Sequence, residues 1–230
     1  MNQKRISMDN WPRRDIFRHF IDDLRCVITV TSRVDVTETL GLCRERGQRF
    51  YPTFLYLVAS ALNRREEWRL RQDETGALLC FGQISPSHII FHPEDELFTR
   101  LITPYSPDFQ TFYVSVTEDM ARNGDKRAFE VQAEGVGATF DASCLPWLDY
   151  SACDLHVYDS GCYLAPIVTW GRYTRQGERM ILPLTMQVHP AVADGFHVSR
   201  FYQDLSADME SLRDRIEEIL PRLPAAYDTL

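Results

Sequence analysis

The sequence lacks an apolar run long enough to cross a membrane. Its first residues, Met-Asn-Gln-Lys-Arg, have none of the apolar stretch that a signal peptide needs. It also lacks internal repeats, low-complexity tracts and linker-like segments. A chain of 230 residues is long enough to bury a full core without disulfides or metals. These absences predict a single cytoplasmic domain that spans residues 1–230.

Cysteine pairs and excess positive charge are absent as well. The six cysteines are scattered, with no Cys-x-x-Cys pair and no His-Cys cluster. We therefore expect no zinc or other metal, and thiols that are buried as small apolar side chains. A net charge of −8 argues against nucleic acid or an anionic membrane as a partner. An anionic small molecule would need a local basic patch.

The patterning of apolar residues predicts alternating helices and strands. Pro52 is placed to open a long apolar helix, and Asn123-Gly124 is a typical helix stop. The predicted helices cover 13–24, 35–45, the segment after Pro52, and 107–122; the predicted strands cover 26–31, 68–70, 77–81, 88–92, the segment around Ser143, 153–157, 163–170 and 180–188. A hairpin is expected at 175–178. The pattern predicts an α/β fold in which helices pack against a large mixed β-sheet as a two-layer sandwich.

One stretch of the chain combines a buried strand, a turn and chemically active side chains. The apolar run from Met180 to Val188 leads through His189 and Pro190 to Asp194-Gly195. A helix is expected to follow, with Phe196, Phe201, Leu205, Met209, Leu212 and Ile216 on roughly one face. A His and an Asp at such a turn fit either an acyl-transfer site or a core histidine beside a helix cap. The residues alone leave both interpretations open.

The sequence around this turn, Val188-His-Pro-Ala-Val-Ala-Asp-Gly-Phe-His-Val198, resembles the His-His-x-x-x-Asp-Gly signature of the chloramphenicol acetyltransferases. The resemblance covers nearly the whole chain and includes Asn10-Trp-Pro-Arg-Arg14, Arg49-Phe-Tyr-Pro52, Ser143-Cys-Leu-Pro-Trp147 and Ala165-Pro-Ile-Val-Thr169. It implies the CoA-dependent acyltransferase fold, acetyl-CoA as co-substrate, a small-molecule hydroxyl acceptor, and a homotrimer with sites at the subunit interfaces.

The resemblance also assigns roles to individual residues. Ser143 matches the serine whose hydroxyl stabilises the tetrahedral oxyanion, and Thr169 matches the threonine that binds the intermediate through water. Arg13 and Asp194 match a buried ion pair that shapes the active site. The second His of the signature, which is the general base of the family, falls on Pro190.

Pro190 has no titratable group, so we expect impaired catalysis. His189 is a weak candidate to replace the base, because neighbouring residues of a strand point to opposite faces. His197 is interpreted as structural. His156 falls on a strand that resembles the wall of the acceptor pocket, but a partly exposed polar residue remains the preferred interpretation.

For coenzyme A, the resemblance implies that Tyr173 stacks on adenine and that Arg172 and Arg49 bind near the phosphates, with Arg175 as a possible addition. For the acceptor, matched pocket positions are occupied by Phe20, Leu24, Phe98, Cys153, Leu155 and Val157. Phe20 stands where the family has a hydrogen-bonding Tyr, and Cys153 replaces an aromatic residue. The acceptor could therefore be a small alcohol other than chloramphenicol.

Two functional hypotheses follow. The first is an acetyl-CoA-dependent O-acetyltransferase with low activity. The second is an inactive homologue that binds a small ligand or coenzyme A without acetylating, which is favoured by the coincidence of Pro190 with the changes at Phe20 and Cys153. The retained Ser143 argues for the first.

Overall fold

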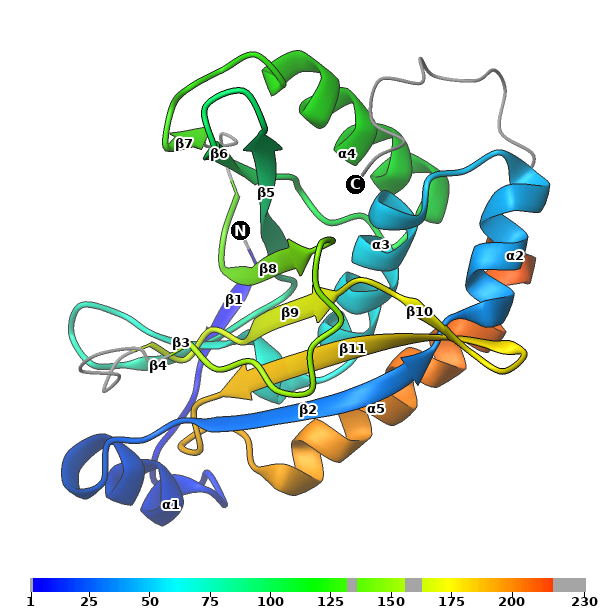
Figure 1. The fold of residues 1–230 in the computed structure, drawn as a ribbon. Helices are drawn as coiled ribbons and strands as arrows, with labels where there is room; N and C mark the ends of the chain where they lie inside the picture. The colour runs from blue at the N-terminus through cyan, green and yellow to red at the C-terminus, as the bar shows by residue number, and fades with distance from the viewer. Residues whose placement is uncertain (1, 132–135, 156–162, 217–230) are drawn as a thin grey trace.

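Strand β11 (Arg179–Val188) is the central strand of the fold. Its residues from Ile181 to Val188 are all buried, as expected for a strand covered on both faces. It pairs antiparallel with β2 (Ile28–Asp35), β9 (Ile167–Gly171) and β10 (Thr174–Gln176). This computed structural model describes residues 2–131, 136–155 and 163–216 (Figure 1).

The main sheet is mixed and eight-stranded, with the order β10-β11-β9-β8-β5-β6-β7 and β2 paired to β11. Its remaining strands are β5 (Ser85–His92), β6 (Leu97–Ile102), β7 (Glu130–Val131) and β8 (Thr139–Leu145). β8 runs parallel to both β5 and β9. A separate three-stranded sheet contains β1 (Gln3–Arg5), β3 (Leu70–Gln72) and β4 (Leu78–Phe81).

Helices cover one face of the main sheet (Figure 1). The helical elements are α1 (Arg14–Arg18), the π-helical turn η1 (His19–Asp23), α2 (Thr37–Arg46), α3 (Phe50–Asn63), the 3₁₀ turn η2 (Glu66–Arg69), α4 (Phe109–Asn123), α5 (Gly195–Glu210) and α6 (Leu212–Arg215). α3 is apolar nearly all round and is buried from Pro52 to Leu62, as such a helix must be. Among the described residues, none of these helices is long and apolar enough to cross a membrane.

The alternation of side chains distinguishes the two faces of the sheet. Val168 and Trp170 in β9 are fully buried in the core beneath the helices. Thr169, between them, therefore points to the opposite face. In β8, Ala142 is buried with the core and Ser143 lies on the opposite face for the same reason.

The predicted α/β fold with a large mixed sheet is confirmed, and most elements lie within a few residues of their predicted positions. Three predictions need correction. Trp68 belongs to η2 rather than to a strand. Cys153–Leu155 is irregular instead of a strand, and 156–157 lies outside the described residues. Phe196 is 66% exposed, because it stands at the start of α5 beside solvent and not on its core face.

Candidate active site

Ser143 and Thr169 lie directly opposite each other in the parallel strands β8 and β9. Both are half-buried, and both point to the sheet face that the helices leave uncovered. The register thus brings together two residues that were predicted to act on the same intermediate and that are separated by 26 positions in sequence.

The row of hydroxyls continues across the sheet. Thr169 is opposite Thr185 in β11, and Thr185 is opposite Thr31 in β2. The Oγ1 atoms of Thr31 and Thr185 are 2.8 Å apart, and Thr185 Oγ1 donates to the hydroxyl of Tyr150 at 3.2 Å. Tyr150 in turn donates to the backbone carbonyl of Thr169 at 2.7 Å. These hydrogen bonds hold β9, the strand that carries Thr169, against Tyr150 and β11.

The sheet forks beside Ser143. β5 and β8 pair through Ser85–Ser87 and Thr139–Asp141, after which β5 continues with β6 and β8 continues with β9. Figure 1 shows β5 running steeply away from β8. The rings of Phe91 and Trp147 meet across the fork with their centroids 4.7 Å apart. The fork separates the β5–β6 arm of the sheet from the β8–β9 arm, which carries Ser143.

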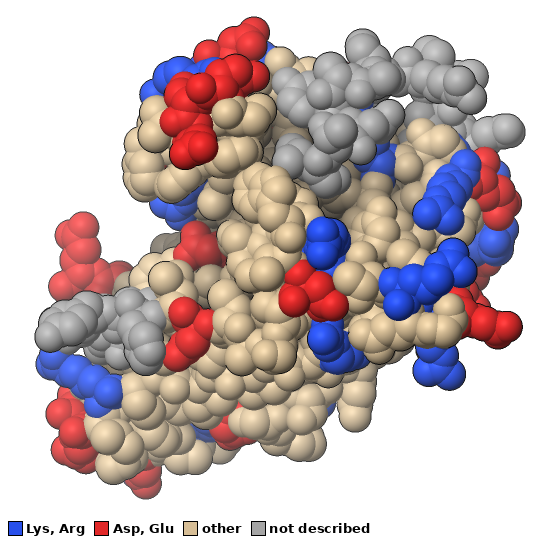
Figure 2. Space-filling view, viewed as in Figure 1, with Lys and Arg blue, Asp and Glu red and all other residues tan. Residues whose placement is uncertain are grey.

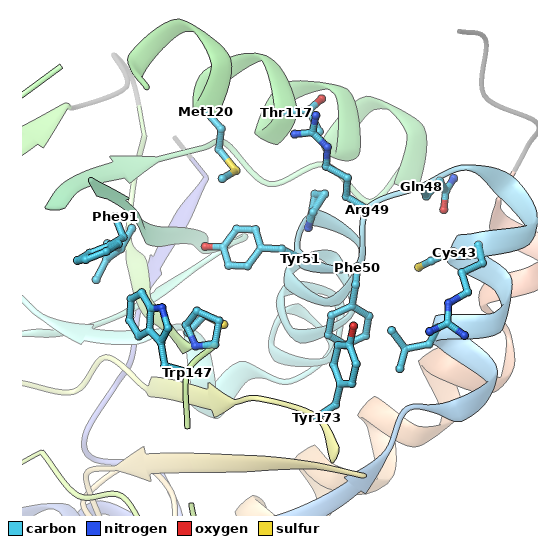
Figure 3. Close-up of a pocket in the computed structure, with 16 residues that line it drawn as sticks. Cys43, Gln48, Arg49, Phe50, Tyr51, Phe91, Thr117, Met120, Trp147 and Tyr173 are labelled. Carbon is cyan, nitrogen blue, oxygen red and sulfur yellow. The ribbon is translucent and has the colours of Figure 1, made fainter. Parts of the chain in front are cut away.

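A cavity of about 220 Å³ lies on the helical side of this fork (Figure 3). Cys144, the neighbour of Ser143, lines it. The other lining residues come from α2, the turn between α2 and α3, α3, α4, β5 and the segments after β8 and β9: Leu40, Cys43, Arg44, Gln48, Arg49, Phe50, Tyr51, Pro52, Ile89, Phe91, Thr117, Met120, Pro146, Trp147 and Tyr173. Burial raises the pKa of Cys43 to about 11 and that of Cys144 to about 12, so both thiols stay protonated and act as apolar wall.

One side of the cavity is aromatic and cationic. The rings of Phe50 and Tyr173 meet edge-to-face with centroids 5.5 Å apart. The side chain of Arg49 runs from the start of α3 towards Thr117 of α4 (Figure 3). The backbone N–H of Arg49 donates to the hydroxyl of Tyr113 at 2.9 Å, which fixes the start of α3. Arg172 is next to Tyr173 but is exposed and does not line the cavity, and the predicted addition Arg175 is exposed on β10. Figure 2 shows Lys and Arg atoms gathered over α2 and the β10–β11 hairpin, although the protein as a whole is acidic.

Arg13 and Asp194 form an ion pair at the start of α5, as expected, but in the single chain the pair is only partly buried, since 40% of the Asp194 side chain is exposed. Arg13 Nη1 donates to Asp194 Oδ2 at 2.9 Å, and its Nη2 donates to the carbonyl of Pro190 at 3.1 Å. His197 Nδ1 lies 2.7 Å from Asp194 Oδ1, and Asp194 also accepts from the backbone N–H of Phe196. Desolvation by itself would raise the pKa of Asp194, but the hydrogen bonds from Arg13 and His197 outweigh it and lower the pKa to about 2.

Pro190 and His189 are both buried just after β11. The Nδ1 of His189 accepts a hydrogen bond from the backbone N–H of Ala191 at 3.2 Å, while its Nε2 is buried without a partner among the described residues. Because Nδ1 is the acceptor, the neutral ring carries its proton on Nε2. Burial also lowers the pKa of His189, which keeps it neutral.

The turn that carries Pro190 is distant from Ser143 within one chain. Ser143, Thr169 and Thr185 share a row, and Val188 stands three residues beyond Thr185, roughly 10 Å along the strand. Pro190 lies past that point. One chain therefore does not bring residue 190 to the hydroxyls of Ser143 and Thr169.

The predicted acceptor wall is largely solvent-exposed in the single chain. Leu24, Phe98 and Leu155 are exposed, whereas Phe20 and Cys153 are half-buried and Val157 lies outside the described residues, as does His156. The backbone N–H of Leu155 donates to the side chain of Gln187 at 3.2 Å. Because Gln187 shares a face of β11 with Thr185, Leu155 lies over the same side of the sheet as Ser143. Phe98 lies on β6, opposite Phe91, and so belongs to the far side of the fork.

Sequence reasoning missed most of the cavity. Tyr51, Trp147 and Cys144 stood in the segments that resemble the family, yet nothing in their local pattern marked them as cavity-lining. Arg44 and Gln48 follow no motif; the only signal was Gly47, a typical helix C-cap, which predicts a turn but not the direction of the next side chain. In the described part of the chain, no group of three His, Cys, Asp or Glu residues is placed to hold a metal ion.

The sequence profile of the chloramphenicol acetyltransferase family matches residues 1–206. A chloramphenicol acetyltransferase of Clostridium butyricum is 32% identical over 217 residues, which cover 94% of this chain and 99% of that protein. One of Streptomyces acrimycini is 36% identical over 87% of this chain and 91% of its own length. The chain belongs to the chloramphenicol acetyltransferase family.

Solved structures agree at the level of the fold. A chloramphenicol acetyltransferase structure superposes with a TM-score of 0.80 at 22% identity, over 90% of this chain and all of that one. The dihydrolipoamide acetyltransferase of Azotobacter vinelandii gives a TM-score of 0.63 at 16% identity, over 86% of each chain. As a member of the chloramphenicol acetyltransferase family, the chain is an acyltransferase, and acyl-CoA is the co-substrate that its family implies.

Proposed function

We propose that this protein is an acetyl-CoA-dependent O-acetyltransferase for chloramphenicol or a similar small alcohol, and that Pro190 makes its turnover slow. The observation that supports this most is the position of Ser143 opposite Thr169, beside the fork whose two arms line the cavity together with Arg49 and Tyr173. Acetyl-CoA extends from the cationic side of the cavity to the fork, where its thioester reaches Ser143.

In the reaction, the acceptor hydroxyl oxygen attacks the thioester carbonyl carbon and gives up its proton. The Ser143 hydroxyl donates a hydrogen bond to the resulting oxyanion, and Thr169 holds the intermediate through a water. The intermediate then collapses, the C–S bond breaks, and the thiolate of coenzyme A takes up a proton. An oxyanion donor of this kind typically lowers the activation free energy by about 3–4 kcal/mol.

Removal of the acceptor's proton is the step that this chain does poorly. Pro190 has no basic side-chain group to accept it, and the Nδ1 lone pair of His189 is engaged by the N–H of Ala191. Solvent must then take the proton. The loss of a general base typically lowers the rate by about 10²–10⁴-fold.

We further propose a homotrimer in which each site combines two subunits. The distance of Pro190 from Ser143 within one chain supports this arrangement, as does the exposure of Leu24, Phe98 and Leu155. One subunit would supply Ser143 and the pocket wall, and its neighbour the 190 region.

The proposal is tested by comparing the parent protein with its Pro190→His variant. Each is incubated with acetyl-CoA and chloramphenicol, and the released coenzyme A is measured by chromatography. A slow parent and a variant about 10²-fold faster or more would support the proposal. A parent that matches the variant would refute the role given to position 190. If neither reacts, other small alcohols are screened before the transferase is rejected.

The shared site has its own test. The double variant Pro190→His/Ser143→Ala lacks the oxyanion donor, and the parent lacks the base. Co-refolded mixtures of the two are expected to be more active than either alone, because some sites then combine the introduced imidazole with Ser143. Mixtures no more active than the average of the two parts would exclude a site shared between subunits.

An inactive homologue that binds coenzyme A is the second candidate, and the engaged Nδ1 of His189 favours it. This candidate predicts that coenzyme A binds to the parent while no hydroxyl acceptor is acetylated, even after prolonged incubation.

A further inference from the structure

The cavity contains a glutamine whose side chain has no hydrogen-bond partner in the protein. Gln48 is 8% exposed, and within the described residues neither its Nε2 nor its Oε1 finds a partner. Both atoms are buried. An amide in that condition loses its hydrogen bonds to water and gains none, which destabilises the folded protein. A ligand that offers both a donor and an acceptor would remove this cost.

The backbone holds Gln48 firmly in place. α2 ends at Gly47, which has a φ of 64° in the left-handed region that favours glycine, and the N–H of Gln48 donates to the carbonyl of Cys43 at 2.8 Å. The next residue, Arg49, is fixed by its N–H bond to the Tyr113 hydroxyl. The side chain of Gln48 is thus directed into the cavity by a fixed helix end, and Figure 3 shows it on the side of Arg49 and Cys43, away from Phe91 and Trp147.

Arg44 lines the same cavity from the last turn of α2. Its side chain is exposed at the rim, and in the described part of the chain no carboxylate lies within 4.0 Å of it. Arg46, on the same helix, does have such a neighbour, since its Nε lies 3.6 Å from Glu45. Arg44 is therefore available to an anion at the mouth of the cavity.

We propose that Gln48 and Arg44 bind the nucleotide half of coenzyme A, with the Gln48 amide hydrogen-bonding the edge of adenine and Arg44 pairing with a phosphate. The proposal rests on the proposed function, which brings coenzyme A to this cavity. A glutamine amide matches the adjacent N6 donor and N7 acceptor of adenine. The cationic side, with Arg44, Arg49 and Tyr173, suits the nucleotide, and the fork with Phe91 and Trp147 suits the apolar arm.

The first test is Gln48→Leu, studied by calorimetric titration of the full-length protein with adenosine 3′,5′-bisphosphate and, separately, with pantetheine. We expect adenosine 3′,5′-bisphosphate to bind about tenfold more weakly and pantetheine to bind unchanged. The melting temperature without ligand should stay equal or rise, because an unsatisfied amide has been removed. The matched control is Gln110→Leu, whose Oε1 is also buried without a partner among the described residues but which does not line the cavity.

Base specificity gives a readout that a purely structural role would not change. The parent should prefer adenosine 3′,5′-bisphosphate to its inosine analogue, in which N6 is replaced by oxygen, and Gln48→Leu should lose that preference. Equal affinity of the parent for both nucleotides would overturn the assignment of Gln48 to adenine, as would unchanged binding to Gln48→Leu or an equal loss for pantetheine.

Arg44→Gln, with Arg46→Gln as its control, tests the phosphate contact. Arg44→Gln should weaken adenosine 3′,5′-bisphosphate binding several-fold and reduce its dependence on salt, while Arg46→Gln should do neither. Equal effects of the two changes would mean that only general charge matters and would refute a specific contact. If the parent binds neither coenzyme A nor its nucleotide half, the proposed function itself fails; if the parent binds both and the variants match it, only this inference fails.

Discussion

Ser143 and Thr169 face each other across two parallel strands, and Thr185 and Thr31 extend their row over the antiparallel strands β11 and β2. A parallel neighbour can only be reached by a long crossover, so these side chains come from distant parts of the sequence. The hydroxyl row crosses the sheet at its most fully paired part and lies on the face without helices. Within the described strands, the Ser143 end of the row lies beside the fork and the Thr31 end does not, which distinguishes the proposed chemical role of Ser143 from the structural role expected of Thr31.

Ser143→Ala should therefore lower kcat/KM about 10²-fold or more, measured in the faster Pro190→His background, because the oxyanion loses a preorganised donor. Thr31→Val is the matched control, since it also removes a hydroxyl of the row. It should change kcat/KM less than threefold while lowering the free energy of unfolding by about 1 kcal/mol. Equal kinetic losses in both variants would mean that the row acts through strand packing and not through the oxyanion.

His189→Ala distinguishes a buried structural histidine from a substitute base. We expect the free energy of unfolding to fall by about 2–4 kcal/mol, because a buried side chain is removed. Turnover of the parent per folded molecule should change less than threefold. The pH profile adds a second measurement: burial lowers the pKa of His189, so a base at this position would give a rate that levels off above that pKa. A rate that instead keeps rising with pH fits proton removal by solvent.

Gly171→Ala should disturb the cavity without touching a ligand-binding side chain. A Cβ at this position would stand 2.5 Å from the carbonyl oxygen of Leu148 and 2.8 Å from Pro183 Cγ, so the 148–150 segment or β9 must move. We expect the free energy of unfolding to fall by about 2–3 kcal/mol and coenzyme A affinity to fall with it, because Tyr173 follows two residues later. Gly41→Ala is the control, since a Cβ there meets nothing within 4 Å. Unchanged stability of Gly171→Ala would contradict the tight packing described here.

Local sequence patterns were sufficient to predict those features that depend only on residues close together along the chain. The apolar run before His189, the Gly-containing hairpin at 175–178 and the Asn123 helix end all lie where the sequence predicted them. Such features depend on neighbours within a few positions. Arg13 and Asp194 were paired through family resemblance, and the structure joins them at 2.9 Å.

The fork and the cavity could not be predicted in this way. They depend on where β5 and β8 stop pairing, which is a relation between strands more than fifty residues apart. The direction of Gln48 depends equally on the end of α2 and on Tyr113 of α4. The exposure of Leu24, a predicted position of the acceptor pocket, could not be predicted for a related reason: in one chain nothing in the described residues covers it.

The ion pair of Asp194 gives a stability that should depend on pH. The pKa of Asp194 is lowered to about 2 in the folded protein, against an ordinary value of about 3.9 in an unfolded chain. The unfolded chain thus binds the proton more readily, so the stabilisation is complete above about pH 4 and is lost as the pH falls through 2. Because 40% of the Asp194 side chain is exposed, solvent screening limits the contribution to about 1 kcal/mol.

Asp194→Asn should therefore be less stable than the parent by about that amount at pH 6, and the difference should shrink towards zero at pH 2. Urea unfolding at fixed protein concentration, repeated at both pH values, measures it. A difference that stays constant across this range would mean that Asp194 acts only as a helix cap, a role that a neutral side-chain oxygen also fills, and not through its charge on Arg13.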